Sequence, residues 1–162
     1  CERCGNPYQW RAARVSDDRL YPPRPILAAS LAVFRDGKVL IASRTAPPAQ
    51  ALFSLPGGVV EIGETLQEAA LREVMEEVGV AAEIVGFVDH AEVIQRDPDG
   101  RIKRHFVITC FAGRWISGEG HTSAEAGAVL WVDPDAMGGI ATTKGLQATL
   151  RKAKAVIENT FK

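Results

Sequence analysis

A short stretch of this chain carries a concentration of glutamates. Glu73, Glu76 and Glu77 fall within five residues, and Arg72 and Glu64 stand close by. If the stretch is helical, a rotation of about 100° per residue places Glu76 and Glu77 about −60° and +40° from Glu73. The three carboxylates then project from one face of the helix, over little more than one turn.

This arrangement of like charges is unfavourable unless a cation is present. Glu73 repels Glu77 at i,i+4 and Glu76 at i,i+3, whereas Glu68 and Arg72 are expected to form one favourable pair. Clustered carboxylates either share protons through raised pKa values or bind a cation. A hard divalent ion with oxygen ligands, Mg²⁺ above all, removes the repulsion directly. The alternative is an ordinary solvated face with salt-bridged pairs, and the spacing argues against it.

The local sequence predicts a helix over residues 65–78. Thr65 and Glu68 form the Thr-x-x-Glu pattern of a capping box, and Gly79 stands where a helix favours a left-handed C-terminal residue. Before the helix, Pro56-Gly57-Gly58 is predicted to be a turn that a ligand can approach closely, because glycine has no Cβ. Apolar residues at helical spacing predict a buried stripe: Leu66, Ala70, Leu71, Val74 and Val78.

Apolar runs and turn residues predict the other elements. Asp36-Gly37 joins two of the expected strands, and residues 97–100 fit a type I turn at the tip of a long hairpin. We therefore expect an α/β fold with a mixed β-sheet sandwiched between helices. The expected strands are residues 26–34, 39–43, 52–55, 80–94, 104–114 and 129–132, and a second helix is expected over 143–160.

The composition is that of a globular domain. The 162 residues are 46% hydrophobic and 24% charged, which suits one domain with a sizeable core. No apolar run approaches the ~20 residues that span a bilayer, and a net charge of −1 provides no field to attract nucleic acid or an anionic membrane. The first ten residues contain no signal-peptide pattern, so a cytoplasmic location is expected.

The N-terminal segment has a different character from the rest of the chain. Residues 1–25 are expected to form an irregular arm before a domain over residues 26–162, because closely spaced prolines disfavour regular structure. Cys1 and Cys4 make half of a zinc knuckle, but a structural zinc ion needs four ligands. Zn²⁺ is therefore not expected there, and Cys110, in a predicted strand, is expected to be buried.

The spacing of the acidic stretch matches the Nudix box at every specified position. Gly58 is followed after five residues by Glu64, and after seven more by Arg72-Glu73-Val74-Met75-Glu76-Glu77-Val78-Gly79-Val80. Leu55-Pro56-Gly57-Gly58 resembles the family's usual entry to the box. Over about residues 26–135, the chain thus resembles a Nudix hydrolase of the ADP-ribose pyrophosphatase-like branch.

The resemblance implies a fold, a reaction and a metal site. The fold is the Nudix α/β/α sandwich, and the reaction is Mg²⁺-dependent hydrolysis of a phosphoanhydride bond, with Mn²⁺ as an alternative ion. The implied metal ligands are Glu73, Glu76 and Glu77, joined by a backbone carbonyl at Gly57 or Gly58. Glu76 and Glu77 are expected to count among the catalytic residues as well.

Three further residues receive roles from the resemblance, and Arg44 is a candidate from its position. Arg72 and Glu64 are expected to orient the carboxylates in the catalytic site. Glu125, in the flexible loop at residues 123–127, is the candidate general base. Arg44 ends the second predicted strand and is a candidate contact to the substrate phosphate, with simple exposure to solvent as the alternative.

Aromatic residues are expected to have mostly structural roles. Trp115 and Trp131 are predicted to fill the core. Tyr21 and Phe53 are weaker candidates for stacking on a nucleobase.

Three functions remain open at this point. Hydrolysis of ADP-ribose or a similar nucleoside diphosphate derivative leads, and a nucleoside triphosphate pyrophosphatase of the house-cleaning type is the alternative. A non-catalytic, nucleotide-sensing Nudix domain belongs to another class, and the intact box argues against it. The expected partners are a small-molecule nucleotide and, following the family, a second copy in a homodimer. Nucleic acid and membranes are not expected as partners.

Overall fold

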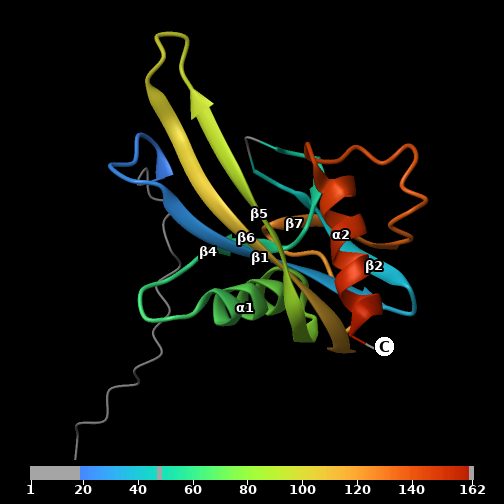
Figure 1. The fold of residues 1–162 in the computed structure, drawn as a ribbon. Coiled ribbons are helices and arrows are strands. Elements are labelled where there is room, and N and C mark those ends of the chain that lie inside the picture. Colours follow the sequence, from blue (N-terminus) through green and yellow to red (C-terminus); the bar gives the residue numbers. More distant parts are fainter. Residues whose placement is uncertain (1–18, 47–48, 161–162) are drawn as a thin grey trace, which may run out of the picture.

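The computed structural model describes residues 19–46 and 49–160. Cys1 and Cys4, where the sequence gives no expectation of zinc, lie outside these ranges. The described residues form seven strands and two helices (Figure 1): β1 (Ile26–Arg35), β2 (Lys38–Arg44), β3 (Phe53–Ser54), β4 (Gly57–Val59), α1 (Leu66–Val78), β5 (Ala81–Arg96), β6 (Ile102–Ser117), β7 (Ala126–Val132) and α2 (Leu146–Asn159).

The strands form one mixed sheet. Its main path runs β3-β2-β1-β6-β5, while β4 pairs with β1 and β7 pairs with β2. β1 runs parallel to β6, and the other pairings are antiparallel. The β5–β6 hairpin extends well beyond the body of the molecule (Figure 1). The mixed sheet expected from the sequence is therefore confirmed.

The sheet divides between β1 and β2. The two strands pair only beside their connecting turn, where Phe34 faces Val39 and Arg35 faces Lys38. Farther from the turn, β1 pairs with β4 and β2 pairs with β3 and β7. This division brings the short strand β4, which carries Gly57 and Gly58, against the start of β1.

The helices cover opposite faces of the sheet (Figure 1). Val74 and Val78 of α1 pack against Leu31 and other residues of one core cluster. Leu150 of α2 packs in a second cluster, with Ile41. Within the ranges that the structure describes, neither helix has the length and apolar character that crossing a membrane requires.

The boundaries of α1 agree with the sequence prediction. The hydroxyl of Thr65 accepts from the backbone N–H of Glu68 at 3.2 Å, and the Glu68 carboxylate accepts in return from the backbone N–H of Thr65 at 2.7 Å. Gly79 has the left-handed conformation, with φ of 67°. The expected ion pair between Glu68 and Arg72 is wrong, because the capping box occupies the Glu68 carboxylate.

The predicted turn at Pro56-Gly57-Gly58 is also wrong. Gly57 to Val59 is strand β4, in register with Ser30, Ala29 and Ala28 of β1. A Cβ on Gly57 would lie 2.4 Å from the carbonyl oxygen of Ala29, so the two backbones can only approach so closely at a glycine. The two glycines, which suggested a turn, instead allow β4 to pair closely with β1.

The two predicted hairpin turns are present. Asp36 and Gly37 both have positive φ, 50° and 76°, as a two-residue turn of the primed type requires. At the other hairpin, the backbone N–H of Gly100 donates to the carbonyl of Asp97 at 2.9 Å. Trp115 and Trp131 are partly buried against the cluster beneath α1, as expected for core residues.

Candidate active site

Two glutamates of α1 lie against the glycine pair of β4. The backbone N–H of Gly57 donates to the Glu77 carboxylate at 3.3 Å. Gly58 faces Glu73 so closely that a Cβ on Gly58 would lie 2.4 Å from Oε1 of Glu73. The motif residues before and inside the helix therefore meet at one place, where α1 crosses β4.

Arg72 is the centre of an ion-pair network beside these glutamates. Its guanidinium donates to Glu64 at 2.7 and 3.1 Å, to Glu73 at 2.8 Å and to Glu76 at 3.1 Å. A further bond of 3.1 Å reaches the carbonyl of Val59 at the end of β4. One planar cation thus ties α1 both to β4 and to the loop that joins them, which is the geometry of a positioning residue.

Glu76 differs from its two neighbours. Its side chain is 55% exposed, whereas that of Glu73 is 13% exposed. The Glu76 carboxylate points to Arg72 from the solvent side, and Glu77 turns to Gly57. The predicted face of three carboxylates is therefore divided into two half-buried groups and one at the rim.

Glu73 and Glu77 form an anionic site in which the nearby positive charge does not balance the two carboxylates. Burial, followed by the charge of Glu73, raises the pKa of Glu77 to about 7. Burial also raises the pKa of Glu73, although the hydrogen bond from Arg72 acts in the opposite direction. The Arg72 guanidinium holds the pKa of Glu64 below its usual value.

Glu125 and Arg44 approach the same site from the other part of the divided sheet. The negative charge of Glu125 raises the pKa of Glu77, and the positive charge of Arg44 lowers it. Arg44 is the last residue of β2, and Glu125 immediately precedes β7, which pairs with β2. The structure thus brings both sequence candidates near the glutamates of α1.

The segment that carries Glu125 is hydrogen-bonded to the end of β2, and the last two residues of the loop expected over 123–127 belong to β7. The Thr45 hydroxyl donates to the carbonyl of Ala124 at 2.7 Å, and the Thr45 backbone N–H donates to the carbonyl of Glu125 at 3.2 Å. The Ser123 hydroxyl accepts from the backbone N–H groups of Glu125 and Ala126. These contacts tie the segment to the end of β2.

The donor chemistry of this site fits a hard divalent cation. Across residues 19–46 and 49–160, no three His, Cys, Asp or Glu side chains converge closely enough to hold a metal ion alone. Arg72 binds oxygens of both Glu73 and Glu76. Glu73, Glu77 and the backbone at Gly57 and Gly58 nevertheless offer oxygen donors, which suit Mg²⁺ or Mn²⁺.

The weaker sequence candidates lie elsewhere. Tyr21 donates its hydroxyl to Asp97 at the tip of the β5–β6 hairpin, and Phe53 packs against the cluster beneath α2. A role for either ring in stacking on a base stays a prediction. Cys110 is buried, as expected, and burial raises the pKa of its thiol to about 11.

Two structural contributors to the site were not expected from the sequence. Val59 acts through its backbone carbonyl, and any residue type supplies that group. Thr45 is one of many polar residues at strand ends, and its partner segment lies 79 residues away. A hydroxyl directly after Arg44 is the only local signal, and it is a weak one.

The comparisons with known proteins agree with this geometry. The model of the NUDIX domain matches residues 24–155. An ADP-ribose pyrophosphatase of Methanocaldococcus jannaschii is 34% identical over 108 residues, which are 66% of this chain and 63% of that protein. A CTP pyrophosphohydrolase of Escherichia coli K12 is 42% identical over 69 residues, covering 42% of this chain and 49% of that protein.

A solved structure has the same fold. The MutT NUDIX hydrolase of Burkholderia pseudomallei superposes with a TM-score of 0.69 at 26% identity, over 80% of this chain and 98% of that one. The fold and the acidic site therefore define a mixed α/β protein whose first helix carries the site. This chain belongs to the NUDIX domain family.

Proposed function

We propose that this protein is a Nudix hydrolase that cleaves a phosphoanhydride bond in a nucleoside diphosphate derivative, with Mg²⁺ as its ion and Mn²⁺ as an alternative. The observation that carries the proposal is the pair Glu73 and Glu77. Both carboxylates are half-buried, and both lie against the glycine backbone of β4. Their raised pKa values indicate that the site lacks a positive charge that a divalent ion would supply.

The metal would be held by Glu73 and Glu77, with Glu76 at the rim and a backbone carbonyl of Gly57 or Gly58. When bound, such an ion neutralises diphosphate charge and activates water. Arg72 and Glu64 position the carboxylates, because the guanidinium binds Glu64 and Glu73 together. The NUDIX match and the hydrolase relatives support this arrangement.

Glu125 and Arg44, on the part of the sheet that contains β2 and β7, suit proton transfer and phosphate binding. Water attacks one phosphorus, a new P–O bond forms, and the bond from that phosphorus to the bridging oxygen breaks with release of two phosphate monoesters. We assign acceptance of the water proton to Glu125, which is exposed and lies near Glu77. We assign a contact to the substrate phosphate to Arg44, whose charge already acts on Glu77.

ADP-ribose or a similar compound is the leading substrate. The support is the likeness to the pyrophosphatase of M. jannaschii, of which the matched residues span 63%. A nucleoside triphosphate pyrophosphatase is the second candidate, because the CTP pyrophosphohydrolase of E. coli is 42% identical over a shorter stretch. A nucleotide-sensing domain without catalysis is less well supported, because the box from Gly58 to Val80 is intact.

The test is a panel of ADP-ribose, NADH, dinucleoside polyphosphates and nucleoside triphosphates, assayed with Mg²⁺ and with Mn²⁺. Glu77→Gln keeps the shape of the side chain and removes its charge, so we expect a loss of about 10²-fold or more in kcat with the fold retained. Glu92→Gln, at an exposed position of β5, is the matched control and should retain wild-type activity.

Two results would contradict the proposal. One is a wild-type protein that hydrolyses no member of the panel with either ion. The other is a folded Glu77→Gln variant with the activity of the Glu92→Gln control. The compounds that are hydrolysed show whether the protein acts on nucleoside diphosphate derivatives or on nucleoside triphosphates.

A further inference from the structure

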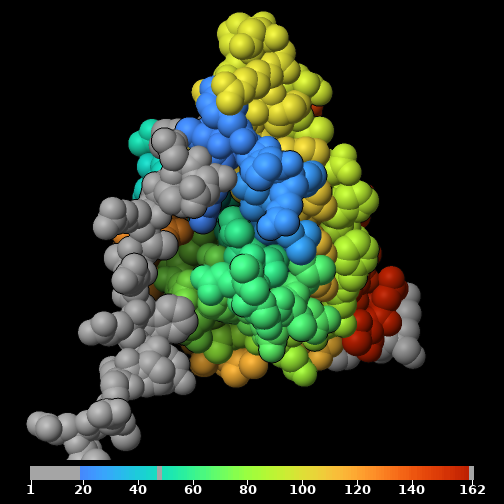
Figure 2. Space-filling model, turned by 90° about the vertical axis from the view of Figure 1, so that its left-hand side faces the viewer, coloured from blue at the N-terminus to red at the C-terminus, as the bar shows by residue number. Residues whose placement is uncertain are grey.

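A cavity of about 380 Å³ lies at the end of strands β1 and β4. Residues 22–27 line one side, and Val59 and Val60 line the other. Figure 2 shows this face, with the first described segment (blue) directly above the loop that follows β4 (green). Apart from Val59, whose backbone carbonyl accepts from Arg72, these residues lie outside the acidic site, and the proposed function assigns their side chains no role.

The cavity lies next to the acidic site, farther along β4 and the residue that follows it. Gly57 lies at Glu77 and Gly58 lies at Glu73, whereas Val59 and Val60 line the cavity. Three residues of extended strand span about 10 Å. A group attached to a diphosphate at the glutamates can therefore reach the cavity if the substrate runs along β4.

One wall of the cavity is rigid. Tyr21 anchors the segment before β1, because its backbone N–H donates to the carbonyl of Lys103 at 2.8 Å and its hydroxyl donates to Asp97 at 2.5 Å. The Arg101 guanidinium lies 3.8 Å above the Tyr21 ring. Prolines at three of the next four positions fix the backbone further. The wall is therefore formed before any ligand arrives.

Arg24 is the charged residue of this cavity, and it forms no ion pair with any described residue. Its guanidinium is exposed. The rest of the lining is proline, isoleucine, leucine and valine. Apolar side chains beside exposed polar atoms and one arginine suit a flat, uncharged heterocycle, since guanidinium both stacks on such rings and donates to their acceptor atoms.

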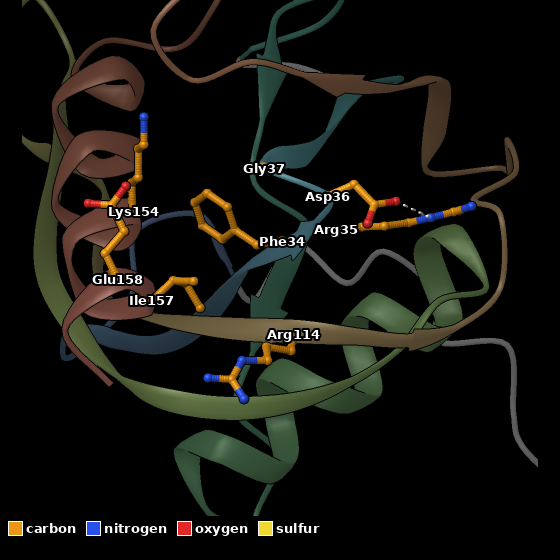
Figure 3. Close-up of a pocket in the computed structure, with 8 residues that line it drawn as sticks. All are labelled: Phe34, Arg35, Asp36, Gly37, Arg114, Lys154, Ile157 and Glu158. Atoms are coloured by element: carbon orange, nitrogen blue, oxygen red, sulfur yellow. Dashed lines mark ion pairs between the residues drawn. The ribbon is translucent and has the colours of Figure 1, made fainter. Parts of the chain in front are cut away.

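A second cavity, of about 230 Å³, has different properties (Figure 3). It lies between the β1–β2 turn and α2, where Phe34 and Ile157 belong to the core cluster away from α1. Its cations are engaged, because Lys154 pairs with Asp135 and Arg35 pairs with Glu119. It is therefore not an extension of the acidic site.

We propose that the cavity beside β4 binds the nucleobase of the substrate, with the ring against the proline and valine side chains and Arg24 on its face or its acceptor edge. The inference rests on the proposed function, because it takes the diphosphate to lie at Glu73 and Glu77. It adds a specificity subsite to that function. Arg24 is a substrate-binding residue in this reading and has no part in bond cleavage.

The experiment compares Arg24→Ala with Arg151→Ala, which removes an exposed arginine of α2 far from the cavity. Steady-state kinetics are measured on the best nucleotide of the panel and on 5-phosphoribosyl 1-diphosphate, a diphosphate without a base. We expect Arg24→Ala to raise KM for the nucleotide about 10-fold, corresponding to about 1.4 kcal/mol. We expect kcat, and the KM for the base-free compound, to change less than twofold.

A binding measurement makes the test independent of turnover. AMP is titrated calorimetrically into the metal-free protein, with inorganic pyrophosphate as the base-free probe. Arg24→Ala should weaken AMP binding about 10-fold and leave pyrophosphate binding unchanged, and Arg151→Ala should alter neither. Equal AMP affinity in the wild type and Arg24→Ala overturns the subsite, even when the protein hydrolyses nucleotides normally. Failure of the whole substrate panel instead contradicts the proposed function.

Discussion

Three glutamates within five residues of one helix meet different surroundings. Glu73 and Glu77 face β4 and lie half-buried, while Glu76 remains at the rim, bound to Arg72. Helical geometry predicts that the three side chains are neighbours, but burial depends on what packs against the helix. The placement of β4 therefore decides which glutamates acquire raised pKa values, and this placement is not visible in the spacing of the box.

The raised pKa of Glu77 predicts a pH dependence of stability. A carboxyl whose pKa is about 4.5 when unfolded and about 7 when folded favours the folded state below pH 4.5 and loses that contribution as the pH rises through 7. The full effect is on the order of 3 kcal/mol. Metal-free wild type should therefore unfold at a lower temperature at pH 7.5 than at pH 5, and Glu77→Gln should depend less on pH.

Thermal unfolding in EDTA at the two pH values measures this effect, with Glu92→Gln as the charge-matched control. Titrating groups distant from Glu77 contribute equally to all three proteins, so the difference between their slopes reports Glu77 together with Glu73, whose charge acts on it. Parallel slopes for the wild type and Glu77→Gln would show that the folded protein leaves this carboxyl unperturbed.

At the scale of elements, features encoded by neighbouring residues could be predicted and those encoded by distant residues could not. The limits of α1 follow from Thr65, Glu68 and Gly79, which lie in or beside the helix. Strand β4 was missed because its identity depends on pairing with β1, about 30 residues earlier in the chain. The spacing pairs Arg72 with Glu68 for the same reason, since one of its actual partners, Glu64, lies in a loop whose path the sequence does not show.

The fit between β4 and α1 predicts that Gly58→Ala damages both stability and activity. The new Cβ would lie 2.4 Å from Oε1 of Glu73, so either the strand or the carboxylate must move. The atoms in the way end a side chain and can shift, but Arg72 binds that carboxylate, so the overpacking costs about 1 kcal/mol and falls mainly on the site. Gly138→Ala is the control, because no atom lies within 4 Å of its added Cβ. Chemical denaturation and the hydrolysis assay check the expectation, and a Gly58→Ala protein with wild-type kcat would disprove it.

At the scale of the whole molecule, the site is assembled across the divided sheet. Glu73 and Glu77 come from the part that contains β1, β4 and α1, and Arg44 and Glu125 come from the part that contains β2 and β7. The sequence predicted most strands and both helices. The parallel pairing of β1 with β6 joins residues about 80 positions apart, and no local pattern encodes such a pairing. The convergence of the four residues was therefore expected from resemblance rather than from spacing.

Because α1 and α2 cover opposite faces of the sheet, we expect that a substitution beneath α2 lowers the stability of the protein without lowering its catalytic rate. Leu150 of α2 is fully buried in the cluster on the face opposite α1. Leu150→Ala should lower the free energy of unfolding by about 2–5 kcal/mol. Its kcat and KM at 20 °C, normalised to folded protein, should remain within about twofold of wild type because the sheet separates the cavity left by Leu150 from Glu73 and Glu77. Arg151→Ala, the exposed neighbour, should change neither quantity. A folded Leu150→Ala protein with a large loss of kcat would show that α2 helps to shape the acidic site through the sheet, and the two faces would then be coupled.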